Sequence, residues 1–175
     1  MSEQIEVLLT KDKIQQKVSE LAKSISADYS DRELVIISIL KGAFVFTSDL
    51  IRALTIPVKM DFVQISSYGA SKTSSGVMKV KKDIDEEIKG KNVLIVDDII
   101  DYGYTLDFLA KHLKHKKPAS VNICVLLDKL SRRRVEVPLS YRGFEVPDVF
   151  VVGYGLDYAE SYRNLSYIGY IKEKT

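Results

Sequence analysis

The sequence is poor in cysteine, in long apolar runs and in excess charge of either sign. Its single cysteine, Cys124, cannot form an internal disulfide, which excludes a disulfide-stapled scaffold and is typical of a reducing compartment. No apolar run approaches the roughly 20 residues of a membrane-spanning helix, and the first residues lack the basic-then-apolar layout of an export signal. We therefore expect a cytoplasmic protein with no membrane partner.

The charge and composition are those of an ordinary globular chain. A net charge of +2 is too small to require nucleic acid as a partner. The 175 residues are 46% hydrophobic and 29% charged, and they contain no repeat or linker that would mark a domain boundary. We predict a single domain that spans residues 1–175.

The most informative stretch runs from residue 93 to residue 106. Four apolar residues, mostly β-branched, predict a buried strand at residues 93–96 that ends at the carboxylates Asp97 and Asp98. A third carboxylate, Asp101, comes next. Gly103 and Thr105 then open a segment whose apolar residues have helical spacing. A strand, an acidic turn and a helix start therefore follow one another.

This order of elements indicates a phosphorylated sugar as ligand. The backbone N–H groups at a helix start suit a phosphate, Gly103 allows close approach, and the Thr105 hydroxyl adds a donor. Carboxylates repel a phosphate, so they should face sugar hydroxyls, a proton to be removed, or Mg²⁺. The alternative is an ordinary strand-to-helix turn. Receiver domains also pair carboxylates at a strand end, but they lack this Gly and Thr.

The remaining chain alternates between strand and helix patterns. A helix is predicted after Thr10, a strand at residues 34–40 and a second helix at 43–54, with Lys41 and Gly42 between these two. Lys41 and Gly42 offer N–H groups where anions bind, or Lys41 is simply a solvated loop lysine. Further strands are predicted at residues 58–65, 77–80, 121–127, 149–154 and 167–171, with a turn at 143–148. The pattern predicts an α/β fold with a mainly parallel sheet, helices on both faces and a site at the carboxyl ends of the strands.

Three polar segments have less certain roles. Residues 66–76 are small, polar and rich in glycine, which fits either a lid over the site or a plain hairpin loop, and Tyr68 favours the lid. His112 and His115 could share a metal, but the sequence supplies no further ligands. The run 132–134 of three arginines is interpreted as solvated or subunit-facing rather than as a nucleic-acid patch.

From about residue 36 to residue 171 the chain resembles the hypoxanthine-guanine phosphoribosyltransferases of purine salvage. The strand, the two acids and the run Ile-Ile-Asp-x-Gly-x-Thr-Leu resemble the phosphoribosyl pyrophosphate signature of that family. The segments that point to its 6-oxopurine branch are 40–42, 67–68, 128–129 and 146–158. The resemblance implies the type I phosphoribosyltransferase fold, a twisted and mainly parallel sheet with a small hood built from the N- and C-terminal segments.

The resemblance also implies an activity, which is Mg²⁺-dependent transfer of the 5-phosphoribosyl group from phosphoribosyl pyrophosphate to hypoxanthine or guanine. The products would be IMP or GMP and pyrophosphate. Asp101 would be the general base or acid at purine N7, and a lid of about residues 67–78 with Ser67 and Tyr68 would exclude water.

The other implied roles fall into four groups. The 5′-phosphate and ribose would meet Asp97, Asp98, Asp101, Tyr102, Gly103, Tyr104 and Thr105; pyrophosphate would meet Lys41, Gly42 and Arg163; the purine would meet Lys129, Phe150, Val151 and Asp157; and the metal would be held near Asp97, Asp98 and Asp157. In this family, the loop with Lys41 and Gly42 often carries a cis peptide that does not involve proline.

The chain departs from the family pattern at three positions. Asp97 stands where many members have Glu, so its contacts to ribose should pass through water or metal. Tyr102 stands where Ser or Thr is frequent, so backbone N–H groups must hold the phosphate without that hydroxyl. Tyr104 replaces a residue that is commonly polar or basic, and it could pack outward.

Two alternatives compete with this interpretation. One is a regulator without enzymatic activity that senses phosphoribosyl pyrophosphate and binds nucleic acid through basic residues of segments 111–117 and 132–134. The other is a transferase that prefers xanthine. An adenine or pyrimidine transferase is disfavoured because Lys129 is a donor suited to an oxo group. The resemblance also suggests a homodimer or homotetramer.

Overall fold

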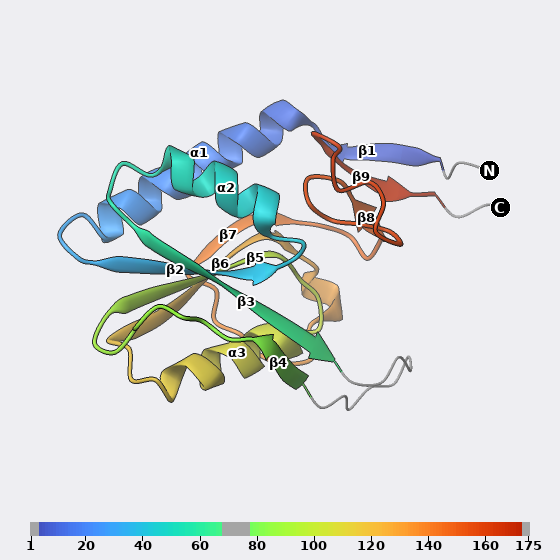
Figure 1. Ribbon diagram of the computed structural model, residues 1–175. Helices are drawn as coiled ribbons and strands as arrows, with labels where there is room; N and C mark the ends of the chain where they lie inside the picture. The colour runs from blue at the N-terminus through green and yellow to red at the C-terminus, as the bar shows by residue number, and fades with distance from the viewer. Residues whose placement is uncertain (1–3, 68–77, 173–175) are drawn as a thin grey trace.

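The computed structural model describes residues 4–67 and 78–172, which form a six-stranded sheet with a smaller sheet at one end (Figure 1). The six strands lie in the order β4-β3-β2-β5-β6-β7; neighbours from β3 to β7 are parallel, and β4 is antiparallel to β3. Their bounds are Leu34–Leu40 for β2, Lys59–Ser67 for β3, Met78–Lys82 for β4, Asn92–Ile100 for β5, Ser120–Asp128 for β6 and Tyr141–Glu145 for β7. The predicted α/β fold with a mainly parallel sheet is confirmed.

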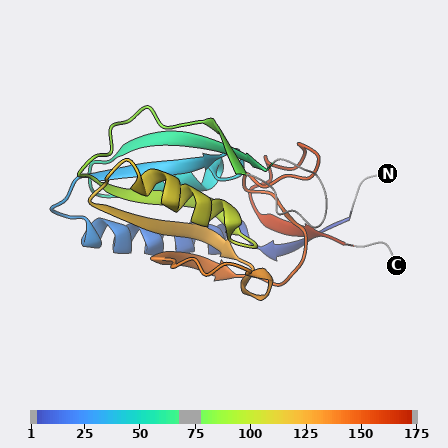
Figure 2. The same cartoon turned by 90° about the horizontal axis from the view of Figure 1, so that it is seen from below.

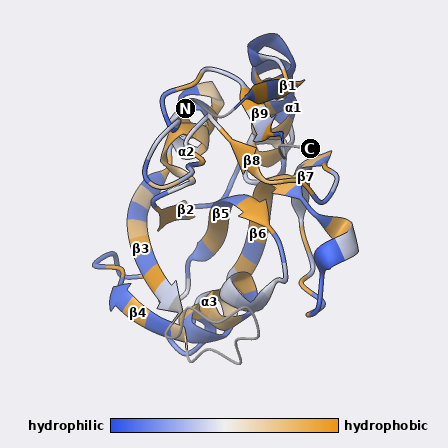
Figure 3. Ribbon diagram, turned by 90° about the vertical axis from the view of Figure 1, so that its right-hand side faces the viewer, coloured by the Kyte–Doolittle hydropathy of each residue, from blue (hydrophilic) through white to orange (hydrophobic). Residues whose placement is uncertain are grey.

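Helices cover both faces of this sheet. Helices α1 (Lys11–Asp28) and α2 (Phe44–Ala53) lie together on one face, and α3 (Tyr104–Lys114) lies on the other (Figures 1 and 3). The side chain of Thr10 accepts a hydrogen bond from the Lys13 N–H, which confirms its predicted N-cap role. No helix among the described residues is long and apolar enough to cross a membrane.

The two faces arise from alternation along the central strands. In β2, Leu34 and Ile36 pack in the core beneath α1 and α2, whereas Val35 and Ile37 pack in the core beneath α3. These four side chains are fully buried. A strand between two helical layers must be apolar on both sides, which explains the unbroken apolar runs in the sequence.

The central strand β5 is longer than predicted. It continues through Asp97 and Asp98 to Ile100, whereas the sequence predicted an end at Val96. Its register with β6 runs on to the pair Ile100 and Asp128, but its register with β2 stops at Ser38 and Val96. Pairing with β6 keeps the chain extended beyond the point where pairing with β2 ends. The two carboxylates therefore lie on a strand and not in a turn.

Near the C-terminus two predictions were wrong. Part of the predicted turn at 143–148 belongs to β7, and a side chain at Gly143 would meet the Leu126 carbonyl oxygen at 2.4 Å, so Gly143 allows close pairing with β6 and is no turn signal. The predicted strand at 149–154 shrinks to β8 (Val151–Val152), because Gly153 has φ of +94° and turns the chain.

The predicted hood from the two ends of the chain is confirmed. Strand β1 (Ile5–Leu9) pairs antiparallel with β9 (Ile168–Ile171), which pairs antiparallel with β8. Figures 1 and 2 place this small sheet beyond the ends at which the parallel strands finish. The hood therefore faces the carboxyl edge of the large sheet, where ligands of open α/β sheets bind.

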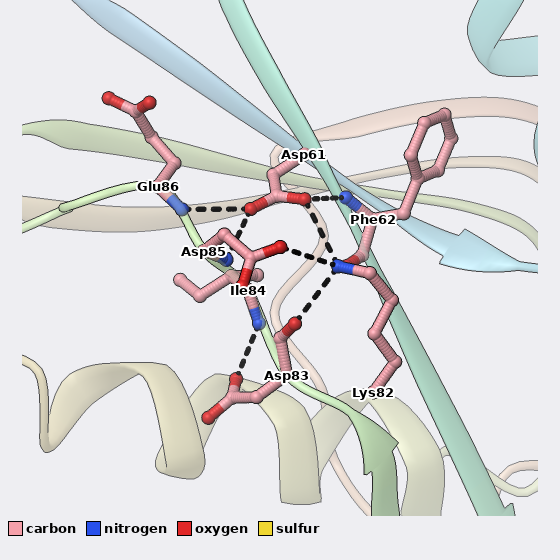
Figure 4. Close-up of polar contacts among 7 residues, drawn as sticks. All are labelled: Asp61, Phe62, Lys82, Asp83, Ile84, Asp85 and Glu86. Atoms are coloured by element: carbon pink, nitrogen blue, oxygen red, sulfur yellow. Dashed lines mark hydrogen bonds and ion pairs between the residues drawn. The ribbon is translucent and has the colours of Figure 1, made fainter.

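The edge ribbon of β3 and β4 is fastened at its base by Asp61 (Figure 4). The Asp61 carboxylate accepts backbone hydrogen bonds from Phe62 at 2.6 Å, Asp85 at 2.6 Å and Glu86 at 2.9 Å, and Lys82 Nζ lies 3.5 Å away. Burial acts to raise the pKa of Asp61, but the three N–H bonds and Lys82 outweigh it and lower that pKa. The carboxylate thus joins β3 to the segment that follows β4.

Candidate active site

Two adjoining cavities open at the carboxyl edge of the large sheet. The larger has a volume of about 390 Å³ and the smaller about 230 Å³. Ile99 and Asp101 line both cavities. The larger is lined by Lys41, Gly42, Asp98, Ile99, Asp101, Lys129, Phe150, Val151, Leu156, Asp157, Glu160 and Arg163, and the smaller by Met78, Asp97, Ile99, Ile100, Asp101, Tyr102, Gly103, Tyr104, Thr105 and Leu106.

The smaller cavity lies at the start of α3. Gly103 is the N-cap residue of this helix, with φ of +94° and no side chain to accept hydrogen bonds from the first turn. The first backbone N–H groups of a helix have no partner within the helix, so those at Tyr104 and Thr105 are available to an anion. A side chain at residue 103 would also meet the Val135 carbonyl oxygen at 3.0 Å. Glycine is thus required both for the turn and for the space.

Asp97 and Asp98 lie side by side at the floor of the two cavities. Burial and the neighbouring Asp98 charge raise the pKa of Asp97 well above its usual range, and burial likewise raises the pKa of Asp98. Neither carboxylate forms an ion pair with a residue of the described ranges 4–67 and 78–172. The charge of Arg163 acts in the opposite direction, toward a lower pKa of Asp98. A pair of carboxylates, one buried and one half-buried, that forms no ion pair with these residues is a suitable place for a divalent cation with water and ligand oxygens.

The Lys41 loop lies directly against Asp98. The peptide bond between Leu40 and Lys41 is cis, as the resemblance suggested. A Cβ at Gly42 would lie 1.9 Å from Asp98 Oδ2, and a Cβ at Gly155 would lie 2.3 Å from the Gly42 carbonyl oxygen. Two glycines therefore let three segments, from β5, the Lys41 loop and the segment after β8, approach one another in the larger cavity.

Arg163 lies in a network with three acceptors. It donates to the Gly155 carbonyl at 2.9 Å and pairs with Asp157 at 2.9 Å and with Glu160 at 3.3 Å. Glu160 also accepts from Lys41 Nζ at 3.1 Å, and the hydrogen bonds from Lys41 and Arg163 lower its pKa. Glu160 thus binds both Lys41 and Arg163, the two basic side chains expected to bind pyrophosphate.

The opposite side of the larger cavity carries a buried lysine and an exposed ring. Lys129 is only 7% exposed, and its Nζ lies 4.0 Å from Asp148. Phe150 is 54% exposed and meets Tyr158 edge to face, with ring centroids 5.5 Å apart. Val151 is the first residue of β8 and lines the same cavity. A planar ring could stack on Phe150 with its polar edge toward Lys129.

Asp101, between the two cavities, is bound by an arginine. Arg132 Nε donates to Asp101 Oδ1 at 2.5 Å, Arg132 Nη1 to Asp148 Oδ1 at 3.0 Å and Arg132 Nη2 to the Tyr102 hydroxyl at 2.6 Å. The guanidinium also lies over the Tyr102 ring, 4.6 Å from its centroid. The Tyr102 hydroxyl is therefore engaged with Arg132.

Two members of the arginine run are not simply solvated, which was one of the two predicted alternatives. Arg132 makes the contacts above, and Arg133 forms two bonds with the fully buried Asp128 at 3.0 and 3.1 Å. Only Arg134 is exposed, and its side chain makes no hydrogen bond or ion pair with the described part of the chain. The run follows the carboxyl end of β6, which was the signal that it belongs at the site.

The structure brings nearly all of the predicted site residues together around the two cavities. The exceptions are in the predicted lid: Tyr68 and most of segment 67–78 lie outside the described residues, while Ser67 ends β3. Arg132 and Glu160 were not predicted. Glu160 precedes Arg163 by three residues in a segment already marked by its charges, but its contact with Lys41 joins residues 119 positions apart. Of the two histidines, His112 contacts the Asp83 carboxylate at 3.0 Å and His115 the Lys111 carbonyl at 2.8 Å.

Comparisons with known proteins agree with this geometry. The family model of the phosphoribosyl transferase domain matches residues 4–159. A hypoxanthine-guanine phosphoribosyltransferase of Dictyostelium discoideum is 49% identical over 173 residues, covering 97% of this chain and 96% of its own, and that of Bacillus subtilis is 48% identical, covering 95% and 92%. A crystal structure of a hypoxanthine-guanine phosphoribosyltransferase from Bacillus anthracis is 45% identical, with a TM-score of 0.91, and covers 98% of this chain and 100% of its own.

Proposed function

Because the chain belongs to the phosphoribosyltransferase family, in its hypoxanthine-guanine branch and with the type I fold, we propose that it is a purine-salvage enzyme. It transfers the 5-phosphoribosyl group of phosphoribosyl pyrophosphate to hypoxanthine or guanine and releases pyrophosphate. The observation that carries the proposal is the place of Asp101, which lines both the cavity at the helix start and the cavity with Phe150 and Lys129. A group there can reach a sugar phosphate and a base together.

The phosphoribosyl group occupies the smaller cavity in this proposal. Its 5′-phosphate accepts hydrogen bonds from backbone N–H groups of residues 102–105 and from the Thr105 hydroxyl, with the positive end of α3 behind them. Asp97 and Asp98 lie toward the ribose hydroxyls. The pyrophosphate group lies toward Lys41, Gly42 and Arg163, so it must displace Glu160 from both basic side chains.

The purine occupies the larger cavity, with its ring against Phe150. Lys129 donates to the 6-oxo oxygen, and the backbone of Val151 and the neighbourhood of Asp157 read the rest of the ring edge. Burial of Lys129 makes an unpaired amino group at position 6 costly, because two donors would then face each other. This arrangement favours 6-oxopurines over adenine.

The reaction then follows from the charges. Purine N9 forms the new bond to C1′ with its lone pair, the C1′–oxygen bond breaks, and pyrophosphate leaves with that electron pair. Asp101 accepts the proton from N7, a step of about 10²–10⁴-fold in rate. Arg163 and backbone N–H groups at Lys41 and Gly42 stabilise the departing anion. Ser67 and Tyr68 are assigned to a lid that excludes water.

A divalent metal is consistent with this family, and we propose Mg²⁺. The carboxylates that would hold it are Asp97 and Asp98, with Asp157 near a second ion through water. This pair of carboxylates, one buried and one half-buried, fits an ion that keeps several waters and binds through few protein oxygens. When bound, Mg²⁺ would orient the ribose hydroxyls and neutralise charge on the pyrophosphate.

Three further expectations belong to the proposal. The chain acts as a single domain over residues 1–175 and assembles as a homodimer or homotetramer. It acts in the cytoplasm, in agreement with a lone cysteine, Cys124, that is fully buried and whose thiol pKa is raised by that burial. Sedimentation equilibrium measures the oligomeric state directly, and a purely monomeric protein at micromolar concentration would contradict that part.

The activity is tested by pyrophosphate release. Phosphoribosyl pyrophosphate and Mg²⁺ are supplied with hypoxanthine, guanine, xanthine or adenine in turn, and release is expected with one or both of the first two but not with adenine. Release with xanthine alone would favour the xanthine alternative. Salt-sensitive RNA or DNA affinity without release would favour a regulator, which the comparisons do not support.

A further inference from the structure

The Arg132 guanidinium is held from three directions at once. Each of its three nitrogens donates to a different residue, at 2.5 Å to Asp101, 3.0 Å to Asp148 and 2.6 Å to the Tyr102 hydroxyl. Its flat face lies against the Tyr102 ring. A planar guanidinium in which all three nitrogens donate hydrogen bonds is held in one orientation. The Asp101 oxygen that it binds is therefore fixed as well.

The backbone around these contacts is fastened as well. The Tyr102 carbonyl accepts hydrogen bonds from the N–H groups of Arg134 at 3.0 Å and Val135 at 3.1 Å, and the Ile100 carbonyl accepts from Lys129 at 3.0 Å. The loop after β6 is thereby bound to the loop after β5 on both sides of Asp101. Arg132 therefore acts from a rigid support.

Asp148 extends this arrangement to the purine side. One of its carboxylate oxygens accepts from Arg132 at 3.0 Å and lies 4.0 Å from Lys129 Nζ. N7 and the 6-oxo oxygen lie on the same edge of a purine, so the base at N7 and the donor to the oxo group must keep a fixed separation. The series of contacts from Asp101 to Arg132, from Arg132 to Asp148 and from Asp148 to Lys129 keeps Asp101 and Lys129 at a fixed separation.

We propose that Arg132 is a positioning residue for the transfer reaction, which holds Asp101 against purine N7 and, through Asp148, holds Lys129 against the 6-oxo oxygen. This role rests on the proposed function, because it acts through Asp101. Tyr102, which replaces the Ser or Thr frequent in the family, contributes a ring and a hydroxyl that keep the guanidinium in place.

The first test compares Arg132→Gln with Arg134→Gln. Both remove one positive charge from the same loop, but only Arg132 has side-chain partners among the described residues. For Arg132→Gln we expect kcat to fall about 10- to 100-fold while KM for phosphoribosyl pyrophosphate changes less than threefold; Arg134→Gln should match the wild type. Equal behaviour of the two variants would overturn the proposal.

Arg132→Lys separates geometry from charge. Lysine keeps the charge but cannot donate in three fixed directions, so this variant should lose nearly as much kcat as Arg132→Gln. Full activity in Arg132→Lys would mean that charge alone matters, which contradicts a positioning role.

A double-mutant cycle tests whether Arg132 acts through Asp101. In the Asp101→Asn background, Arg132→Gln should cause less than a threefold further loss of kcat, because the group that it positions is already disabled. Independent, multiplying losses would overturn the inference. If Asp101→Asn alone kept near-normal turnover, the assignment of the base itself would fail, which is a different result from a failure of the Arg132 role.

Discussion

Gly42 is the residue at which the packing of the site is tightest. A Cβ there would lie 1.9 Å from Asp98 Oδ2, and the first atoms that it meets all belong to the Asp98 side chain. A carboxylate tip can move aside at small cost, whereas a backbone atom cannot. Glycine at residue 42 therefore leaves room for the Asp98 carboxylate.

We therefore expect Gly42→Ala to fold normally and to lose activity. The added methyl group displaces Asp98, so turnover should fall at least tenfold while the unfolding temperature changes by less than about 3 °C. Gly90→Ala is the matched control, because a Cβ at Gly90 would have no neighbour within 4 Å. Its free energy of unfolding should fall by only about 1 kcal/mol, because residue 90 has a φ of +72°. Normal turnover in Gly42→Ala would contradict the account.

Asp101→Asn tests the proton acceptor. An amide cannot take the N7 proton, so kcat should fall about 10²- to 10⁴-fold, with little change in KM for phosphoribosyl pyrophosphate. Asp107→Asn makes the same substitution at a half-buried carboxylate in the first turn of α3, which pairs with Lys111 at 2.7 Å, and should leave kcat within twofold. Steady-state kinetics of the two variants decides the matter.

At the scale of the element, the sequence predicted the strands and helices well where their periodicity is strong. The strand at 34–40 and the helix after Thr10 are found as predicted, because an unbroken apolar run and a spacing of three and four residues each have one structural solution. The extension of β5 to Ile100 was missed because it depends on β6, a neighbour in space. Arg132 and Glu160 were missed for the same reason.

The Asp61 carboxylate helps to hold the ribbon of β3 and β4 to the segment that follows β4. Asp61→Asn keeps the shape but loses the charge that three N–H groups and Lys82 share (Figure 4), so the free energy of unfolding at pH 7 should fall by roughly 1–3 kcal/mol. Asp85→Asn, whose side chain is 92% exposed, should change it by less than about 0.5 kcal/mol. Urea unfolding measures both.

The same variant has a defined pH dependence. Because the pKa of Asp61 is lowered in the folded state, its charge stabilises the fold above the unfolded pKa of about 3.9, and this contribution is lost as the pH falls through the folded pKa. The difference in stability between wild type and Asp61→Asn should therefore be full at pH 7 and shrink below about pH 4. A difference that does not depend on pH would show that the carboxylate charge is unimportant.

The segment from Asp157 to Arg163 should control access of pyrophosphate. The Glu160 side chain is 67% exposed and pairs with both Lys41 and Arg163. Its removal leaves Lys41 available to an anion and takes away one of the two carboxylates that pair with Arg163. We expect Glu160→Gln to bind pyrophosphate about two- to fivefold more tightly in calorimetry, the scale of an exposed ion pair. Glu136→Gln, at an exposed position that lines neither cavity, should bind as the wild type does. Weaker binding by Glu160→Gln would contradict this role.

At the scale of the whole molecule, the hood is tied to the body of the protein through Tyr154. This residue is 3% exposed, and its hydroxyl donates to Asp49 of α2 at 2.5 Å. The sequence predicted a hood but not this bond, since residues 49 and 154 are far apart in the chain. The segments on either side of β8 carry Phe150, Asp157 and Arg163, so the bond between Tyr154 and α2 helps to position one side of the larger cavity.

Removal of the hydrogen bond between Tyr154 and Asp49 should lower stability without leaving a cavity in the core. In Tyr154→Phe the ring stays packed, so the free energy of unfolding should fall by about 1.5–3 kcal/mol, the usual contribution of a hydrogen bond to a charged group. Tyr158→Phe is the control, because Tyr158 is 42% exposed and contacts its neighbour Phe150 through its ring. An equal loss in the two variants would contradict a special role of the Asp49 bond.

The central claim is that main-chain amides at the start of α3 hold the 5′-phosphate of the nucleotide. A crystal of the protein soaked with inosine 5′-monophosphate tests this most directly. The account predicts phosphate oxygens within about 2.7–3.2 Å of the backbone nitrogens of Tyr104 and Thr105, with the base against Phe150. A phosphate bound instead between Lys41 and Arg163, with the loop at Gly103 empty, would contradict it.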